Sequence, residues 1–524
     1  MADIYDEYGV HFSLYPKQQL FLAHPDFTKN IPGYVVPTEA LFGGAAGSSK
    51  SFSLRAISVI VAIECPGVNI YLFRKTHGEL RANHLNGPNG YRAWLATAIK
   101  RKLVKIDSSA NIIYFKNGPG GGYAGGSNII LCHCQHEDDV HKYQGDEIHV
   151  LMIDEATHFS MDSYTFLRSR VRTGSWRPPE KWKHWFPRIL LGSNPGGCNH
   201  LGLKRMFVDF VDKANPYAPK WAPKDDGGML RQYIPGTVYD NPALLKEDPG
   251  YIDRLKGLGS AELVKAMLEG NWDIVAGGMF DDVWDSKYTV MQSFKVPENW
   301  YINRGFDWGS AVPFACLWFA ESNGEEVELR DGTKTSFPRG TLFVIEELYG
   351  NNPTGKNPDS GVMLANQEIG FRIKSTENNS PVLRGISHRI QAGPADNQIF
   401  NIMSNDTIAR GINAGYWGSD KMKDVDIFYM SDKSSGSRVK RWSLMRDRFK
   451  AVLNLRDGKP MENAGLIVFS NCSNTVRTLP TLPRKQNDPE DIMDYVPDHI
   501  ADVIGYRCLQ RGNGLGRLKV KFGG

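Results

Sequence analysis

Two groups of residues in this chain have types and spacings that suit phosphate chemistry. The first begins with residues 43–51, which read Gly-Gly-Ala-Ala-Gly-Ser-Ser-Lys-Ser, and continues where the apolar run 149–153 ends in Asp154 and Glu155. A glycine-rich loop before a helix presents backbone N–H groups to phosphate oxygens. Acids at the end of a buried strand hold Mg²⁺ and orient a water molecule. The first half of the chain is therefore predicted to bind ATP with Mg²⁺.

The reach of each side chain gives it an expected role at this site. Lys50 is expected to contact the β- and γ-phosphates, Ser51 and Asp154 to hold Mg²⁺, and Glu155 to polarise the attacking water. The loop residues expected to surround the phosphates are Gly44, Gly47, Ser48 and Ser49. The usual pattern, G-x-x-x-x-G-K-[ST], has glycine where this chain has Ser49. The loop alone is equally typical of an ordinary turn, and the Asp154–Glu155 strand end favours the ATP site.

Two further positions are candidates for nucleotide contacts. Gln18, in Tyr15-Pro-Lys-Gln18, is expected to face the adenine edge, although an ordinary polar loop residue is the alternative. Asn194, in the turn 192–197, is expected to lie near the γ-phosphate with Ser193, where a plain Asn-Pro-Gly turn is the alternative. An arginine usually stabilises the transition-state charge, and the loop contains none. The arginines considered for that role are Arg74, Arg168, Arg170 and Arg172.

The second group consists of acids that are far apart in the second half of the chain. Asp307 and Asp396 each follow a predicted strand, and His499 and Asp502 are spaced to share one face of a helix. Carboxylates brought together repel, and divalent metal ions relieve that repulsion. Two such ions activate a water and stabilise the leaving oxygen. We therefore expect a nuclease site with Mg²⁺ or Mn²⁺, although Asp307 and Asp396 could be turn or cap residues. Asp498 is expected to cap the helix.

Composition sets limits on what the chain is. Its 524 residues are enough for two or three domains, and a net charge of +4 is too small to indicate nucleic-acid binding by itself. A basic tail, residues 511–524, is either a solvated end or a docking or DNA-contacting segment. The seven cysteines suggest a reducing compartment, and Cys132-His133-Cys134 fits a strand better than a zinc site. With no apolar run long enough to span a bilayer and no signal peptide, we expect a cytosolic protein.

The predicted elements position the two groups in separate domains. The first half alternates strands and helices, and its continuous apolar strands are typical of a parallel sheet covered on both faces. The second half opens with three strands at 300–307, 313–320 and 340–349, which fits an RNase H-like fold. The predicted division is an ATPase domain, 1–273, a linker, 274–298, a nuclease domain, 299–510, and the tail.

Taken together, these motifs resemble the large terminase subunit of tailed bacteriophages. The resemblance rests on motif order over roughly residues 12–508 rather than on any single motif. The matching segments are Tyr15–Gln18, Gly43–Ser51, Phe73–Thr76, Leu151–Ala156, Leu167–Arg172, Gly192–Gly197, Tyr239–Pro242, Gly270–Asp273, Asp307, Asp396 and Asp498–Asp502. Two departures are Ser49 in the loop and the lack of the loop arginine that some members carry, so an arginine finger is unassigned and could act in trans.

The resemblance implies an α/β chain with an N-terminal P-loop ATPase domain of the ASCE type and a C-terminal RNase H-like nuclease domain. It implies a motor that moves double-stranded DNA into the prohead and cuts concatemeric DNA when packaging starts and ends. The implied partners are DNA, the portal protein, a small terminase subunit and other copies of the chain in a ring, usually a pentamer. The implied place is the host cytoplasm, transiently on the prohead, and no membrane contact is expected.

Three other readings compete with this one. A DNA helicase or remodeller with a structural C-terminal domain predicts ATP hydrolysis without metal-dependent cutting. A resolvase- or transposase-like nuclease whose first half only binds nucleotide does not account for Glu155 beside Asp154. A non-enzymatic capsid-docking protein needs neither site. The presence of all three acids, Asp307, Asp396 and Asp502, argues against the first of these.

Overall fold

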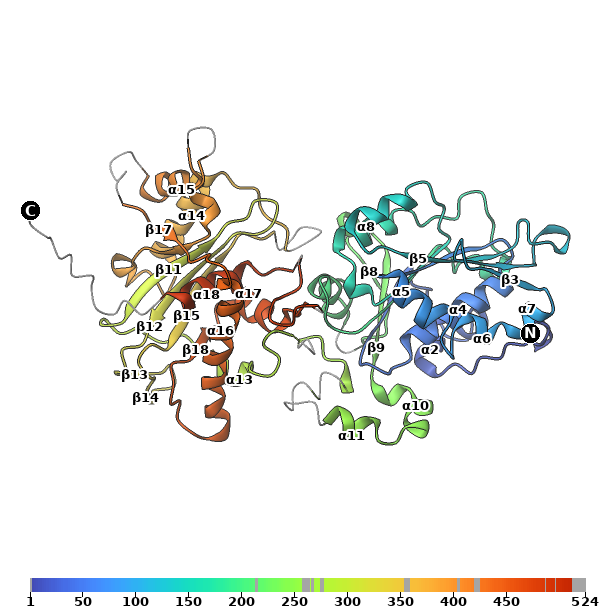
Figure 1. Ribbon diagram of the computed structural model, residues 1–524, viewed down its shortest axis with the longest axis horizontal. Helices are drawn as coiled ribbons and strands as arrows, with labels where there is room; N and C mark the ends of the chain where they lie inside the picture. The colour runs from blue at the N-terminus through green and yellow to red at the C-terminus, as the bar shows by residue number, and fades with distance from the viewer. Residues whose placement is uncertain are drawn as a thin grey trace, which may run out of the picture. The chain divides into compact units, whose positions relative to one another are not determined.

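The computed structural model forms two compact units, residues 1–276 and 277–524 (Figure 1). Each unit is built around its own sheet. The residues that the structure describes are 2–212, 215–256, 264, 268–273, 278–352, 359–402, 406–418, 425–485, 487–494 and 496–510. The basic tail, 511–524, lies outside them. Within the described ranges, no helix combines the length and apolar character needed to cross a membrane.

The first unit contains a nine-stranded sheet among its described residues. Its strand order is β3 (Val104–Asp107), β4 (Ile112–Phe115), β5 (Asn128–His133), β2 (Asn69–Arg74), β6 (Val150–Asp154), β7 (Arg188–Ser193), β1 (Glu39–Gly44), β9 (Leu230–Gly236) and β8 (Lys220–Trp221). The six strands from β5 to β9 in this order run parallel. Strand β7 therefore lies between β1, which leads into the glycine-rich loop, and β6, which ends at Asp154. The parallel sheet predicted for the first half of the chain is thus present, with one strand between the loop-bearing strand and the acid-bearing strand.

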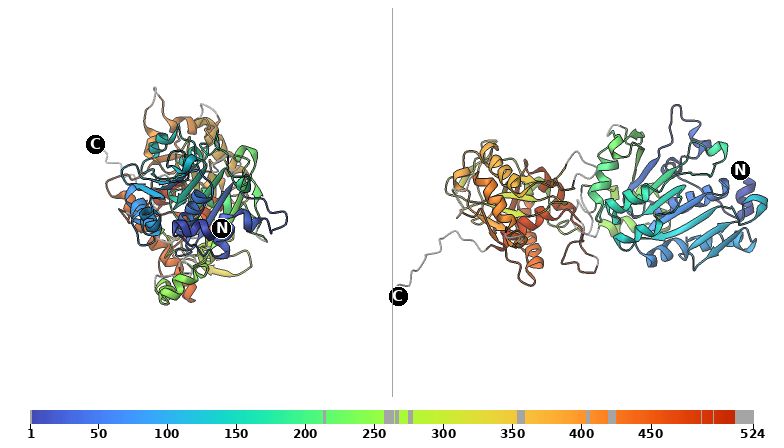
Figure 2. Two further views of the ribbon diagram at one scale, coloured as in Figure 1. Left: turned by 90° about the vertical axis from the view of Figure 1, so that its right-hand side faces the viewer. Right: turned by 90° about the horizontal axis from the view of Figure 1, so that it is seen from above.

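Both faces of this sheet are covered (Figure 2). Alternate residues of one strand enter different cores: Leu190 packs with the apolar residues of α4, whereas Ile189 and Leu191 pack with those of α8. This alternation explains why the strands are continuous apolar runs in the sequence. The helices of this unit are α1 (Ala2–Tyr8), α2 (Pro16–Leu22), α3 (Pro25–Thr28), α4 (Lys50–Glu64), α5 (His77–Leu80), α6 (Tyr91–Trp94), α7 (Ala96–Lys100), α8 (Met161–Arg168), α9 (His200–Leu203), α10 (Pro242–Glu247) and α11 (Tyr251–Lys256).

The second unit contains a seven-stranded sheet among its described residues. Its strand order is β10 (Val290–Met291), β18 (Leu466–Phe469), β15 (Leu342–Tyr349), β12 (Ala315–Glu321), β11 (Tyr301–Asp307), β16 (Gly393–Ala395) and β17 (Phe428–Met430). Strands β11, β12 and β15 are antiparallel, and β16 and β17 run parallel to β11. This is the expected RNase H-like arrangement, and the predicted α/β fold class is confirmed for both units.

Helices and a hairpin complete the second unit. Helix α18 packs on β11, β12 and β16, and α16 packs along α18. A separate hairpin joins β13 (Glu326–Glu328) to β14 (Lys334–Ser336). The helices are α13 (Ser286–Thr289), α14 (Asn366–Asn379), α15 (Ile408–Trp417), α16 (Ser437–Leu453), α17 (Ser473–Thr478) and α18 (His499–Leu509). The contact of α18 with the first strand brings the distant acids of the sequence to one place.

The stretch predicted to be a linker, residues 274–298, is packed into the second unit in its described part. Residues 278–298 belong to the second unit, where Phe280 and Trp284 are buried and each lies edge-on to Phe449. Strand β10 also pairs with β18. The aromatic residues of this stretch explain the difference, because they bury apolar area that an exposed linker would leave in water. Residues 274–277 lie outside the described part.

Candidate functional site

The glycine-rich loop at the end of β1 has backbone angles and close contacts that few residue types can adopt. Gly44 has φ +138°, and a Cβ atom there would lie 2.2 Å from the carbonyl oxygen of Gly236. Ser49, which stands where the usual pattern has glycine, adopts the left-handed conformation with φ +66°. The serine thus keeps the loop geometry that glycine normally provides, at a strain of about 1 kcal/mol or more. The left-handed backbone of Ser49 therefore explains how a serine can stand where the usual pattern has glycine.

Gln18 is buried against this loop. Its Nε2 donates to Ser49 Oγ at 2.8 Å, and its Oε1 accepts from the backbone N–H of Tyr15 at 2.8 Å. Asn241, in the Tyr239–Pro242 motif, donates to the carbonyl oxygen of Gly47 at 2.8 Å. Two motifs that are far apart in the sequence therefore hold the loop at two nearby residues, Ser49 and Gly47.

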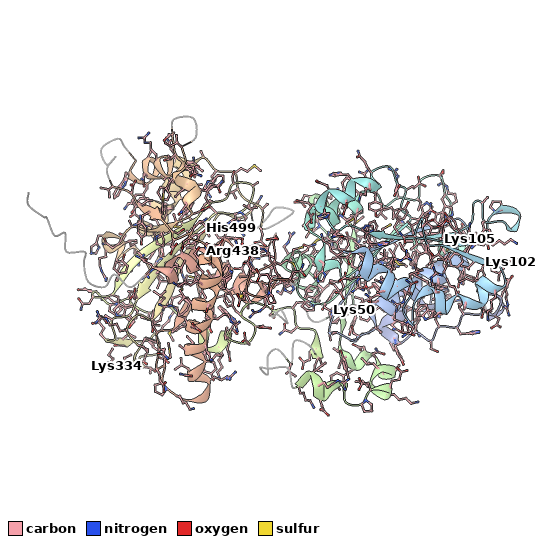
Figure 3. The ribbon with its side chains drawn as sticks, in the orientation of Figure 1. Lys50, Lys102, Lys105, Lys334, Arg438 and His499 are labelled. Atoms are coloured by element: carbon pink, nitrogen blue, oxygen red, sulfur yellow. The ribbon has the colours of Figure 1, made fainter. Side chains whose placement is uncertain are left out.

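Lys50 lies at the start of α4 (Figure 3), with its ammonium group folded onto the loop. Its Nζ donates to the carbonyl oxygen of Ala45 at 2.6 Å and to Ser48 Oγ at 3.0 Å. Burial lowers the pKa of Lys50 to about 8, although the charges of Glu155 and Asp154 oppose this. A buried cation held only by neutral oxygens fits a loop that binds anionic phosphates.

Asp154 and Ser51 meet across the carboxyl edge of the sheet. Ser51 Oγ donates to both carboxylate oxygens, at 2.9 and 3.0 Å. Asp154 Oδ2 also accepts from Arg74 Nη1 at 3.0 Å and lies 2.9 Å from His84 Nε2. Burial alone would raise the pKa of Asp154, but the hydrogen bond from His84 and the charge of Arg74 lower it to about 2. The hydroxyl and the charged carboxylate form a donor pair that suits Mg²⁺.

Glu155 is linked to the turn that follows β7. Asn194 Nδ2 donates to Glu155 Oε1 at 3.4 Å. Ser193 Oγ accepts from the backbone N–H of Thr157 at 3.1 Å. The carboxylate expected to polarise a water is therefore positioned by the turn that was expected to face the γ-phosphate.

Of the four arginines considered as a finger, one reaches this site. Arg74 pairs with Asp154, whereas Arg168 pairs with buried Glu39, the first residue of β1. Arg170 donates to the carbonyl oxygen of Gln144, and Arg172 lies 4.0 Å from Glu147.

In the second unit, two elements bring the predicted acids together. Asp307 ends β11, and the backbone N–H of Asp396 donates to the carbonyl oxygen of Phe306 at 3.0 Å, which places the two acids side by side. Helix α18 supplies His499, whose Nδ1 lies 2.6 Å from Asp307 Oδ2, and Tyr506, whose hydroxyl donates to Asp307 Oδ1 at 2.7 Å. Burial raises the pKa of Asp307, and the charge of Asp502 adds to this rise.

Cationic side chains face the other carboxylates of this cluster. Lys433 donates to Asp396 Oδ1, and Arg441 Nη1 lies 3.2 Å from Asp502 Oδ1. Burial and the charge of Asp498 raise the pKa of Asp502 to about 6. Both carboxylates therefore lie in surroundings where neighbouring cations offset part of a charge that burial disfavours.

Asp498 does not have the role predicted for it. It occupies the N-terminal position of α18, but its side chain makes no capping hydrogen bond. Its Oδ2 instead lies 3.2 Å from Nη2 of Arg438 on α16, a residue labelled in Figure 3. The ion pair draws the carboxylate away from the helix N–H groups, so the capping prediction is wrong.

The donor types of this cluster fit Mg²⁺ or Mn²⁺. Carboxylate oxygens are the ligands that these hard ions prefer, and Asp502 Oδ1 is a buried oxygen without a hydrogen-bond donor. Among the described residues, no three His, Cys, Asp or Glu side chains already form a metal-binding group. Lys433 donates to Asp396 Oδ1, one of the oxygens that a metal ion would use, whereas Arg441 lies near Asp502 Oδ1 without a hydrogen bond to it.

Several residues of the two sites were not identified from the sequence. Tyr506 follows Asp502 by four positions, so helical spacing could have placed it on the same face. Lys433, Arg441, His84 and Thr157 carry no such signal, because tertiary packing alone brings them to the sites.

Comparison with known proteins gives a family match. Residues 41–285 match the family described as terminase large subunit, T4likevirus-type, N-terminal. The large terminase of the thermophilic bacteriophage D6E is 14% identical, with 95% of this chain and 98% of that chain covered and a TM-score of 0.36. The ATPase domain of the Thermus phage P74-26 large terminase is 12% identical, with coverages of 52% and 98% and a TM-score of 0.33.

The nuclease domain of the P22 large terminase is 13% identical, with 44% of this chain and 90% of that chain covered and a TM-score of 0.28. No curated protein matches the chain. The family match spans the glycine-rich loop, the Asp154–Glu155 strand end and the turn 192–197. Residues 41–285 of this chain are therefore similar to the N-terminal part of large terminase subunits of the T4likevirus type.

Proposed function

We propose that this chain is a large terminase subunit, a viral DNA-packaging motor in which ATP hydrolysis by the first unit drives double-stranded DNA into the prohead. The observation that carries the proposal is the meeting of three groups at one edge of a sheet. These are Lys50 on its loop, the Ser51–Asp154 pair, and Glu155 held by Asn194. The match of residues 41–285 to the terminase family supports the packaging role.

Each residue of the first site has a proposed part in hydrolysis. Lys50 would exchange the neutral oxygens of Ala45 and Ser48 for phosphate oxygens, which compensate its charge better. Ser51 and Asp154 would hold Mg²⁺, and Glu155 would take the proton of the attacking water. Gly44, Gly47, Ser48 and Ser49 would surround the phosphates, and Gln18 would lie near the adenine while it holds the loop.

We further propose that the second unit is a DNA endonuclease that cuts concatemeric DNA when packaging begins and ends. Asp307, Asp396 and Asp502, with His499, would hold two Mg²⁺ or Mn²⁺ ions. Such ions activate a water and stabilise the leaving oxygen of the phosphodiester. The raised pKa of Asp307 and of Asp502 supports a cation between these carboxylates, because a bound cation relieves the cost of their burial.

The proposed partners follow from the family. They are double-stranded DNA, the portal protein, a small terminase subunit and further copies of this chain in a ring, which we propose to be a pentamer in the host cytoplasm. The DNA grip should be mostly to phosphates and therefore sensitive to salt. Since Arg74 is committed to Asp154, an arginine finger supplied by a neighbouring copy is part of this proposal.

The test measures plasmid cutting in Mg²⁺ or Mn²⁺ beside DNA-stimulated ATP hydrolysis. Wild type is compared with Asp307→Ala and Glu155→Ala. We expect Asp307→Ala to lose cutting and keep ATP hydrolysis, and Glu155→Ala to lose ATP hydrolysis by about 10²–10⁴-fold and keep cutting. Wild type that hydrolyses ATP but never cuts would overturn the nuclease proposal and favour a helicase or remodeller.

A further inference from the structure

His200, six residues after Asn194, makes two contacts that have no part in the proposed hydrolysis. His200, the first residue of α9, is buried, and its two ring nitrogens face different partners. Nδ1 lies 3.0 Å from the backbone nitrogen of Gly196, and Nε2 lies 2.9 Å from the carbonyl oxygen of Trp272. One side chain therefore joins the turn 192–197 to a segment more than seventy residues away.

The partners of His200 fix its protonation. Burial lowers the pKa of His200 to about 4, so the ring is neutral at neutral pH. Nδ1 faces an N–H donor and must accept, whereas Nε2 faces a carbonyl oxygen and must carry the proton. A single tautomer satisfies both contacts, which suits a rigid connection between two backbone groups.

The far end of this connection lies against the glycine-rich loop. The Trp272 ring is buried and stacked on His200, with ring centroids 5.2 Å apart. A Cβ atom at Gly43 would lie 2.8 Å from Trp272, and one at Gly270 would lie 2.4 Å from the backbone nitrogen of Ala45. No side chain separates the segment 270–272 from the start of the loop.

A second contact joins the same two parts of the chain. Lys204, one helical turn after His200, lies 3.2 Å from Asp273. A continuous path thus runs from Glu155 through Asn194 and the turn to His200, and then to Trp272 beside the loop. Both ends of the path are at the proposed ATP site.

We propose that His200 is a positioning residue that couples the turn 192–197 to the segment 270–272. A displacement of Gly196 when the γ-phosphate leaves would be passed through the ring to Trp272. This segment directly precedes the division between the units at residues 276 and 277. The nucleotide state would thereby reach the part of the chain that leaves the motor unit. The inference rests on the proposed ATP hydrolysis.

Three variants separate the two contacts. His200→Asn keeps an acceptor near the Nδ1 position, His200→Gln keeps a donor near the Nε2 position, and His200→Phe keeps the stacked ring without either hydrogen bond. The matched control is His149→Phe. His149 is also buried and stacked on a tryptophan, Trp176, with its Nδ1 accepting from a backbone N–H.

The first readout is steady-state ATP hydrolysis. We expect kcat to fall about 10-fold in each His200 variant while KM stays within about twofold, because His200 does not face the nucleotide. The control should keep kcat. Unchanged kcat in all three His200 variants would overturn the inference, whereas failure of wild type to hydrolyse ATP would overturn the proposed function itself.

The second readout is hydrogen–deuterium exchange of the full chain with ATPγS or ADP. In wild type, exchange at 192–197 and at 268–273 should both depend on the nucleotide. In the His200 variants, the dependence should persist at 192–197 and disappear at 268–273. This result distinguishes coupling from general destabilisation, which would change exchange in both segments without regard to nucleotide. Persistence at 268–273 in every variant would contradict the inference.

Discussion

The two acidic sites of this molecule solve the problem of a buried carboxylate in opposite ways. Asp154 in the first unit is surrounded by donors and a cation, Ser51, His84 and Arg74, and its pKa is lowered to about 2. Asp502 in the second unit lies among other acids, and burial and Asp498 raise its pKa to about 6. The surroundings of Asp154 therefore favour its charged form even without a ligand. The surroundings of Asp502 favour its neutral form.

This difference indicates how each site would respond to its metal ion. At Asp154 the protein itself supplies the compensating groups, so the geometry is ready before nucleotide arrives. At Asp307 and Asp502 the repulsion between acids is partly unrelieved, so a divalent ion would contribute to the stability of the unit as well as to chemistry. For the proposed nuclease, cutting would then require bound metal ions, which would help to restrain it while DNA moves.

The largest expected effect comes from removing one carboxylate charge from each site, which tests the contrast between the two units. Asp154→Asn removes the buried counterion of Arg74, which keeps only the more distant and more exposed Glu79, so we expect the first unit to lose about 3 kcal/mol. Asp307→Asn should cost the second unit much less, because burial and Asp502 already disfavour that charge. Hydrogen exchange of the β6 and β11 peptides of the full chain in increasing urea measures both. Equal losses in the two units would contradict the contrast.

The pH dependence of the two units should run in opposite directions. A lowered pKa makes Asp154 stabilising above its unfolded pKa of about 4, and this stability is lost as pH falls towards about 2. A raised pKa means that folded Asp502 binds a proton that the unfolded chain releases. The second unit should therefore lose stability as pH rises from about 4 through about 6.

Exchange of the α18 peptide between pH 4 and 7 checks the second half of this prediction. Added Mn²⁺ should remove the loss at higher pH, since a bound ion favours the charged carboxylates. Stability of the second unit that is flat over this range without metal would show that Arg441 and Lys433 compensate the acids fully.

Replacing Lys433 is expected to have a smaller effect, on the affinity of the second site for Mn²⁺. Lys433 pairs with Asp396, and its side chain is about a third exposed. We expect Lys433→Met to tighten Mn²⁺ binding by up to about fivefold, because a pair of this kind contributes up to about 1 kcal/mol. Titration of the free Mn²⁺ signal by electron paramagnetic resonance gives the affinity. The control is Lys440→Met on the exposed face of α16, which should leave it unchanged.

The smallest effect should come from the loop. Ser49→Gly removes the strain of a left-handed serine but adds the backbone freedom of glycine to the unfolded chain. These terms oppose each other, so we expect a net change within about 1 kcal/mol and little effect on ATP hydrolysis. A thermal melt with and without ATPγS is sufficient. A large loss of nucleotide binding would mean that the serine hydroxyl, through Gln18, has a role beyond loop shape.

Much of the fold was predictable. The parallel strands of the first unit are continuous apolar runs, and turn signals at Asn323-Gly324 and Asp331-Gly332 separate the second and third opening strands of the second unit. The linker was not predictable, because Phe280 and Trp284 find their packing partner, Phe449, far along the chain. No local pattern reports such a contact. The glycine-rich loop was identified by pattern, but only the φ of Ser49 shows why the departure is tolerated.

The sites divide in the same way. Strand ends and helical spacing were enough to nominate Asp154, Asp307 and Asp502, because those rules are local. Their partners could not be nominated, because Arg441 and His84 reach the carboxylates through tertiary packing. The sequence therefore does not reveal the electrostatic surroundings that lower the pKa of Asp154 and raise the pKa of Asp502.

The position of Trp272 has a practical consequence for dividing this protein. A shortened first unit that ends after α11 would retain every residue proposed to touch ATP and still lose a wall of the glycine-rich loop, since Gly43 and Gly44 pack directly on 270–272. Excision of the first unit as a working module should therefore include residue 273. The end of the first unit is set by packing against its glycine-rich loop rather than by the last strand of its sheet.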